Sequence, residues 1–205
     1  FKLTYDIKVS HVTIASWCKK FAPIFLNIAD RLTKNLDLGT SDEWHADETV
    51  VFINGEKHYL WLIIDSETRM VLGFNLSPSR DASQAFALFN SASKFGCPSA
   101  IVTDRLGSYN LATKTIFNTS RHIKVQSFKD DISNNLIEAF NDTFKDWYKR
   151  KRGFKSFESA NTLIAMFIFH YNFLRPHYAL NNLTPAQVAG ITVNEKDISN
   201  WLLSA

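Results

Sequence analysis

Three β-rich segments in a row, the first two joined by a tight turn, restrict this 205-residue chain to few folds. Strands are predicted over residues 44–53, 57–66 and 69–77. Asn54 and Gly55 lie between the first two strands, and this dipeptide favours the left-handed backbone of a two-residue hairpin turn. The sequence therefore predicts a three-stranded antiparallel meander.

Helices and short strands alternate after the meander. Asp81 is the predicted cap of a helix to about residue 94, and Gly96 and Pro98 separate that helix from an apolar strand over 100–103. There follow a helix over 108–117, a strand over 122–127, a helix over 134–150 and a last apolar helix from Ser156 or Ser159 to Leu174. This order predicts an α/β protein of the RNase H-like fold, a mixed five-stranded sheet flanked by helices.

The N-terminal segment is expected to be helical. Ser10 is a candidate N-cap, and apolar residues recur after it at helical intervals. The pattern is typical of the second half of a helix-turn-helix, but a plain amphipathic helix packed on the main domain explains it equally well. Because the chain opens without methionine, we expect it to lack an N-terminal portion. We predict a helical segment over 1–36, a candidate remnant of a DNA-binding domain, then a polar linker over 37–43, the RNase H-like catalytic domain over 44–191 and a tail over 192–205.

Composition excludes several classes of protein. Hydrophobic residues make up 45% and charged residues 21% of the chain, as in a globular domain. No apolar run approaches the roughly 20 residues of a membrane span, so we expect a cytoplasmic protein. Cys18 and Cys97 have neither the spacing of zinc ligands nor that of a disulfide framework. The net charge of +3 alone does not indicate a nucleic-acid partner.

Three acidic residues occupy positions from which their carboxylates could converge. Asp47 lies in the first predicted strand, Asp104 follows the strand over 100–103, and Glu138 lies on the helix over 134–150. The predicted topology places the first strand beside the fourth and packs that helix across both. Carboxylates brought together repel one another unless a cation neutralises them, and oxygen ligands favour Mg²⁺ or Mn²⁺. Two such ions can stabilise a phosphoryl transfer, so we predict that the three acids are catalytic metal ligands.

A basic surface is predicted on the same helix. Residues 138, 141, 145, 149 and 152 share one face if the helix continues that far. The stretch from 145 to 155 holds six of the 23 basic residues, with aromatic residues between them. Local charge of this kind predicts contact with DNA phosphates, although a solvated basic face is the alternative. The candidate DNA-binding residues here are Lys145, Lys149, Arg152 and Lys155.

Together these motifs resemble those of DDE-type transposases of prokaryotic insertion sequences, in the retroviral-integrase superfamily, and most closely insertion-sequence family six. The matching segments are Trp44-His45-Ala46-Asp47-Glu48-Thr49, Asp81-Ala82, Val102-Thr103-Asp104-Arg105-Leu106-Gly107-Ser108-Tyr109, Asn134-Asn135-Leu136-Ile137-Glu138, Lys145, Gly153-Phe154-Lys155-Ser156-Phe157, Asn172-Phe173-Leu174-Arg175-Pro176-His177 and Thr184-Pro185-Ala186. The resemblance covers residues from about 44 to 191.

The resemblance implies an integrase-like catalytic core that cleaves DNA strands and transfers them at insertion-sequence ends. It implies metal binding by Asp47, Asp104 and Glu138, with two Mg²⁺ or Mn²⁺ ions, and contact of Lys145 with the element's terminal inverted repeats. Arg105 stands where the family commonly has lysine, which preserves a cation beside the second acid. Target DNA is the other substrate, and a homodimer or higher oligomer is expected because two ends must be held at once.

Two alternatives are compatible with the same motifs. One is a transposase-derived DNA-binding or regulatory protein without catalysis, against which the three intact acids argue. The other is an RNase H-like nuclease that cuts without joining.

Several further residues have competing interpretations. Strand alternation is expected to point His45 and Glu48 away from Asp47, and Asp65 is expected to be a turn residue. Ser108 and Tyr109 follow Asp104 closely, so they could position DNA, although N-capping of the next helix explains Ser108 equally well. Arg175 and His177 flank a proline at a helix end, where capping and DNA contact are both open.

Overall fold

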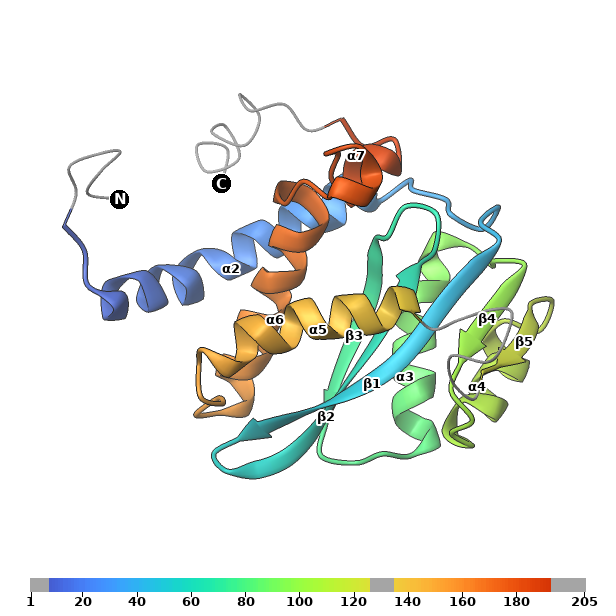
Figure 1. Ribbon diagram of the computed structural model, residues 1–205, viewed down its shortest axis with the longest axis horizontal. Helices are drawn as coiled ribbons and strands as arrows, with labels where there is room; N and C mark the ends of the chain where they lie inside the picture. Colours follow the sequence, from blue (N-terminus) through green and yellow to red (C-terminus); the bar gives the residue numbers. More distant parts are fainter. Residues whose placement is uncertain (1–7, 126–134, 193–205) are drawn as a thin grey trace.

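A mixed five-stranded sheet forms the centre of the protein (Figure 1). The computed structural model describes residues 8–125 and 135–192. The strands are β1 (Glu43–Ile53), β2 (Glu56–Asp65), β3 (Val71–Ser77), β4 (Ala100–Thr103) and β5 (Arg121–Lys124), in the spatial order β3-β2-β1-β4-β5. β1, β2 and β3 pair antiparallel, while β4 is parallel to both β1 and β5. The predicted mixed sheet is confirmed.

The hairpin between β1 and β2 forms as its turn residues require. Asn54 and Gly55 have φ angles of 52° and 83°, the left-handed conformation that asparagine and glycine tolerate best. The turn fixes the register, in which Asp47 lies opposite Leu62.

Helices cover both faces of the sheet (Figure 1). On one face lie α3 (Ala82–Ala92), the short 3₁₀ turn η1 (Ser93–Phe95) and α4 (Ser108–Ile116); on the other lie α5 (Asn135–Lys149) and α6 (Phe157–Phe169). Asp81 caps α3 by accepting a hydrogen bond from the Ser83 amide at 2.9 Å, as predicted. Because β1 alternates, Trp44 and Ala46 pack on the α3 face, while Val51 and Ile53 pack on the α5 face.

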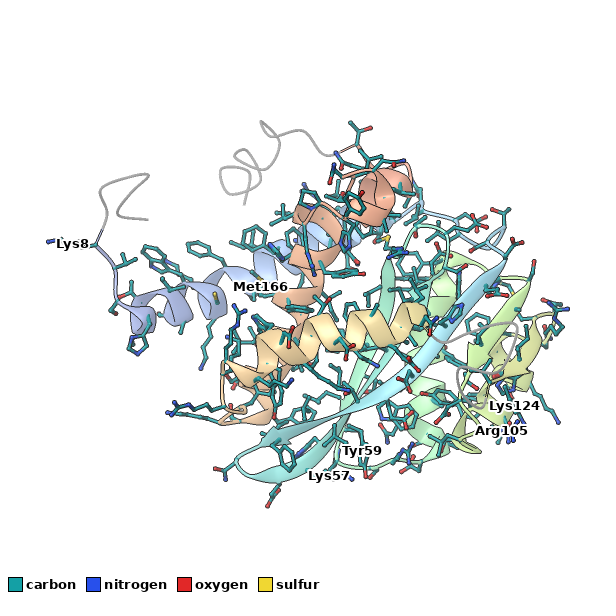
Figure 2. All side chains as sticks on the ribbon, in the orientation of Figure 1. Lys8, Lys57, Tyr59, Arg105, Lys124 and Met166 are labelled. Carbon is teal, nitrogen blue, oxygen red and sulfur yellow. The ribbon has the colours of Figure 1, made fainter. Side chains whose placement is uncertain are left out.

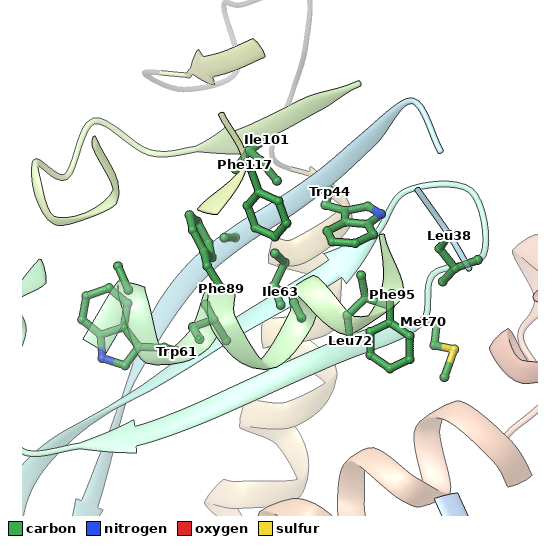
Figure 3. Packing of buried hydrophobic residues seen from close by; sticks show 14 of the residues in the cluster. Leu38, Trp44, Trp61, Ile63, Met70, Leu72, Phe89, Phe95, Ile101 and Phe117 are labelled. Carbon is green, nitrogen blue, oxygen red and sulfur yellow. The ribbon is translucent and has the colours of Figure 1, made fainter. Parts of the chain in front are cut away.

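The core on the α3 face is largely aromatic. Trp44 and Phe117 meet edge to face at 5.5 Å between ring centroids, and Phe89 lies 5.4 Å from the same Phe117 ring. Figure 3 shows these rings between the sheet and α3, with Leu38 and Met70 at the far side of the cluster. This packing holds β1 and β4 rigidly at the point where they carry the predicted acids.

A long helix, α2 (His11–Thr33), lies against α6. Ser10 caps α2 through a 3.1 Å hydrogen bond from the Thr13 amide, as predicted. Phe25 packs on Phe169 with 5.0 Å between ring centroids, and Ile28 belongs to the main core. The division of the chain into four segments stays a prediction. No helix in the described residues has the length and apolarity needed to cross a membrane.

The C-terminal region is built from short elements. α6 begins after the Ser156 cap and continues into a π-helix, η2 (His170–Leu174), so the predicted helix end at Leu174 holds. A 3₁₀ turn, η3 (Tyr178–Leu180), and α7 (Pro185–Val188) follow. A strand is predicted over 122–127, whereas β5 covers Arg121–Lys124. Residues 126 and 127 of the predicted strand lie outside the described residues.

Candidate active site

The site forms where β4 ends beside a longer strand. β4 pairs with β1 only from Glu43 to Ala46, and Thr103 is the last residue of β4. Asp47 is therefore the first residue of β1 without a neighbour on that side, and Asp104 directly follows β4. The two acids meet at this notch because parallel strands bring corresponding ends together.

Three carboxylates gather at the notch. Single oxygens of Asp47, Glu48 and Asp104 all lie within 4.8 Å of one another, close enough to hold one metal ion. All three residues have intermediate exposure, although the side chain of Glu48 is only 4% exposed and that of Asp104 is 37% exposed. A donor set made entirely of carboxylate oxygens suits a hard divalent cation.

The electrostatics of Asp47 also favour a cation. Burial, the largest cause, and the charges of Glu48, Asp104 and Glu138 together raise the pKa of Asp47 to about 7. Asn141 of α5 donates a hydrogen bond from Nδ2 to Asp47 Oδ2 at 2.8 Å, and its own Oδ1 is buried without a partner. An acid held in this setting releases its proton more readily when a metal ion binds.

Glu48 is held by two hydrogen-bond donors. Its Oε1 accepts from the Arg80 guanidinium, with 2.7 Å to Nε, and its Oε2 accepts from the Tyr109 hydroxyl at 2.8 Å. Arg80 Nη2 also lies 3.9 Å from Asp104 Oδ2. Burial raises the pKa of Glu48, and the hydrogen bonds from Arg80 and Tyr109 oppose that rise. Both oxygens of Glu48 are thus already engaged, so Asp47 and Asp104 are the more available ligands.

Glu138 lies near the carboxylate cluster but is not one of its members. It lies exposed in the first turn of α5, which packs on β1, and its charge contributes to the raised pKa of Asp47. It is not among the oxygens within 4.8 Å of one another. The structure therefore brings Asp47 and Asp104 together and places Glu138 nearby; the catalytic roles of all three stay predictions.

The predicted DNA-binding residues are all exposed but do not form one helical face. Lys145 lies on α5 on the side of Glu138, and Lys149, the last residue of that helix, lies 3.8 Å from Asp146. α5 ends at Lys149, and Arg152 beyond it has a left-handed φ of 55°. The helix therefore does not continue far enough for Arg152 to share the face of Glu138 and Lys145. Lys155 lies further along the chain, and Arg105 lies at the β4 and β5 side of the molecule with Lys124 (Figure 2).

Sequence reasoning misjudged two residues at the notch. Glu48 does point to the opposite face from Asp47, as alternation requires, but its longer side chain reaches round the end of β4 to the same cluster. Tyr109 is fully buried and supports Glu48, so it cannot contact DNA. Arg80 and Asn141 were not assigned roles, although Asn141 shares the predicted helix face with Glu138.

The remaining candidates have structural roles. His45 Nε2 lies 3.1 Å from Glu43 Oε2, away from the cluster. Asp65 is buried at the end of β2, where its Oδ2 accepts from the amide and hydroxyl of Thr68 at 2.7 and 2.6 Å, as a turn residue would. Ser108 is the first residue of α4 after the Gly107 cap, so its side chain makes no capping bond.

Residues 41–177 match the family model of the DDE domain of IS240-type transposases. This match spans more than half of the chain, which therefore belongs to the DDE transposase family. The transposase of the insertion sequence-like element IS431mec of Staphylococcus aureus is 31% identical over 165 residues, covering 77% of this chain and 67% of that protein. The IS257 transposase of transposon Tn4003, also from Staphylococcus aureus, matches at the same identity and coverage. The predicted family is confirmed.

Retroviral integrases are among the solved structures with a similar fold. A chain of the simian T-cell lymphotropic virus intasome aligns with a TM-score of 0.58 at 18% identity, covering 74% of this chain and 55% of its own length. The catalytic core domain of HTLV-2 integrase, solved in complex with magnesium, aligns with a TM-score of 0.55 at 16% identity, covering 75% of this chain and 99% of that domain. These likenesses confirm the predicted integrase-core fold.

Proposed function

We propose that this protein catalyses metal-dependent cleavage and strand transfer of DNA at insertion-sequence ends. The observation that carries the proposal is the convergence of the Asp47 and Asp104 carboxylates at the notch beside β4, with the charge of Glu138 close by. The membership of the chain in the DDE transposase family supports the same chemistry.

Asp47, Asp104 and Glu138 are the proposed ligands of Mg²⁺ or Mn²⁺, with two ions in the complete site. Asp47 and Asp104 fit such an ion, because single carboxylate oxygens of the two lie within 4.8 Å of each other and their charges repel. Glu138 is the third proposed ligand, and its charge contributes to the raised pKa of Asp47. The HTLV-2 integrase core of the same fold was solved with magnesium. Bound ions would neutralise the charge that develops on a phosphate during in-line displacement.

The protein's own groups orient this chemistry. Asn141 fixes Asp47 through the 2.8 Å hydrogen bond to Oδ2, so α5 directs this carboxylate. Arg80 and Tyr109 hold Glu48 within the cluster, and Arg80 places a cation 3.9 Å from Asp104. Such preorganisation reduces the rearrangement needed when metal and DNA bind.

The proposed substrates are the element's terminal inverted repeats and target DNA. The exposed cations Lys145, Lys149, Lys155, Arg152 and Arg105 are the proposed phosphate contacts. Because two element ends must be joined to one target, we propose that the active form is a dimer or larger. The HTLV-2 integrase core was solved in both trimeric and dimeric forms.

The test is an assay of the full-length protein on a labelled duplex that carries the terminal repeats. Mg²⁺ should produce nicked strands and joined products, and Asp104→Asn should reduce both by at least about a thousandfold while DNA binding persists. Asp42→Asn, a change of an exposed aspartate outside the cluster, is the matched control and should keep activity. DNA binding without metal-dependent cleavage would favour the regulatory alternative, and cleavage without joining would favour the nuclease.

A further inference from the structure

The Arg175-Pro176-His177 segment borders a cavity that the proposed chemistry does not use. The cavity has a volume of about 200 Å³. Four parts of the chain line it: the turn between β2 and β3, through Arg69; α5, through Ala139 and Thr143; η2, through Tyr171; and the segment that follows η2.

Two arginines in this cavity lack an acidic partner. Arg69 and Arg175 are both half-buried, and neither forms an ion pair within the described part of the chain. Among the described residues that line the cavity, none is an aspartate or a glutamate. Two guanidinium groups that line the same space without an acid concentrate positive charge there, and this favours an anion. Planar guanidinium groups bind phosphate oxygens in particular, because they can donate two parallel hydrogen bonds.

The backbone and the side chain of Arg175 have separate tasks. Its amide ends η2 by donating to the His170 carbonyl at 2.8 Å, so the capping role belongs to the backbone alone. Its guanidinium lies over the Tyr171 ring, 5.9 Å from the centroid. His177 donates from Nε2 to the Tyr171 carbonyl at 3.3 Å and packs edge to face on the same ring at 4.4 Å. Tyr171 thus lines the cavity and contacts both Arg175 and His177.

Arg69 lies in the turn between β2 and β3, and hydrogen bonds of its neighbours stabilise this turn. Its φ of 59° is a left-handed conformation that arginine rarely adopts. The turn is stabilised on either side, because Thr68 donates from its amide to Asp65 Oδ2 at 2.7 Å and the Asp65 amide donates to the Met70 carbonyl at 2.9 Å. Strained residues that the surroundings hold in place are a frequent feature of ligand sites.

The position of the cavity suits a DNA strand. Ala139 and Thr143 face the cavity, while Asn141 on the same helix contacts Asp47. The cavity and the carboxylate cluster are therefore separated by the width of one helix, roughly 10 Å. Tyr178 at the rim is 93% exposed, and exposed aromatic rings beside basic grooves stack on nucleobases.

We propose that Arg69 and Arg175 form a subsite for a DNA backbone phosphate, which anchors the strand across α5 from the carboxylate cluster, with Tyr178 stacking at its rim. The subsite rests on the proposed function, since it assumes a DNA substrate. The phosphate could belong to an element end or to target DNA, and the shared chemistry is that of a phosphodiester.

The test measures binding of the full-length protein, with Ca²⁺ in place of Mg²⁺, to two fluorescent duplexes, one with the terminal repeats and one of unrelated sequence. Arg69→Gln and Arg175→Gln should each weaken binding about tenfold and lower the slope of log affinity against log salt by about one. Lys57→Gln, an exposed cation at the far end of the β1–β2 hairpin (Figure 2), should leave the slope unchanged. A loss with the repeat duplex alone assigns the phosphate to the element end, and a loss with both assigns it to DNA in general.

Tyr178→Ala is the second variant, because an exposed residue can be removed without unfolding the protein. It should weaken binding several-fold without a change in salt slope. Unchanged affinity and slope in folded arginine variants, beside a wild type that binds, would overturn the subsite and leave the proposed function standing. A wild type that binds neither duplex would contradict both. Unfolding of the arginine variants with unaltered binding by Tyr178→Ala would also overturn the subsite.

Discussion

At the scale of single residues, Asp47 carries a cost for stability that fits a metal ligand. Its pKa rises from an ordinary 3.8 to about 7 because it is buried among other acids. The folded state therefore favours the protonated form of Asp47. The resulting contribution to the free energy of unfolding is fully present below about pH 4 and is lost as the pH rises to 7. In the absence of metal, ionised Asp47 should destabilise the fold at alkaline pH.

Asp47→Asn should therefore stabilise the metal-free protein above pH 7. The upper limit is about 4 kcal/mol, from three pKa units, and partial exposure should make the measured gain smaller. Urea unfolding in EDTA at pH 8 and pH 5 measures it, with a much smaller difference expected at pH 5. Asp42→Asn, an exposed control, should change neither value. A variant no more stable than wild type at pH 8 would show that Asp47 is not held in this repulsive setting.

Tyr109 supports the cluster through one hydroxyl. Tyr109→Phe removes the 2.8 Å hydrogen bond to Glu48 and keeps the buried ring. The free energy of unfolding should fall by about 1–3 kcal/mol, because a half-buried carboxylate loses a donor. Tyr178→Phe removes a hydroxyl from a ring that is 93% exposed and should change stability by less than about 0.5 kcal/mol. Equal effects in chemical denaturation would contradict the supporting role of Tyr109.

The limits of prediction are clearest at the notch. Asp47 and Asp104 could be placed together from the sequence, because strand order and parallel pairing bring those positions together. Glu48 could not, because alternation fixes only the face of a side chain and not its reach past the end of a short neighbouring strand. Arg80 reaches Glu48 from the loop before α3, and no local pattern encodes such a distant contact.

At the scale of elements, local signals determined most boundaries. Asn54-Gly55 made the hairpin and Ser10 and Asp81 capped their helices, since each acts within a few residues. α5 ends at Lys149, close to the predicted end at about residue 150, but its basic face does not extend to Arg152, which adopts a left-handed backbone that arginine rarely takes. Long-range contacts between elements were equally inaccessible to local patterns.

Asn172 makes one such contact between η2 and the edge of the sheet. Its side-chain amide accepts from the Val71 amide at 3.0 Å and donates to the Val71 carbonyl at 2.8 Å, in a buried setting. Asn172→Ala leaves both backbone groups without these partners, so stability should fall by about 2–4 kcal/mol in urea unfolding. Asn161→Ala, on the exposed side of α6, should change it by less than about 0.5 kcal/mol. A small loss for Asn172→Ala would mean that η2 and β3 are not joined in this way.

At the scale of the whole molecule, the proposed DNA contacts lie on both sides of α5. The carboxylate cluster lies on one side of α5, and the cavity of Arg69 and Arg175 lies on the other. Lys145 on the exposed surface of that helix adds a cation beside Glu138. A strand that crosses α5 could thus be held by phosphate contacts on both sides of the scissile bond.

The most direct test of the proposed metal site is cleavage of the protein backbone by Fe²⁺ bound in place of Mg²⁺. With ascorbate and peroxide, hydroxyl radicals formed at the ion should cut the full-length chain near residues 47, 104 and 138, and excess Mg²⁺ or Asp104→Asn should suppress all three cuts. Mass spectrometry of the resulting fragments gives the positions of the cuts. Cuts confined elsewhere, or cuts near these residues that neither Mg²⁺ nor Asp104→Asn suppresses, would contradict a shared site formed by the three acids.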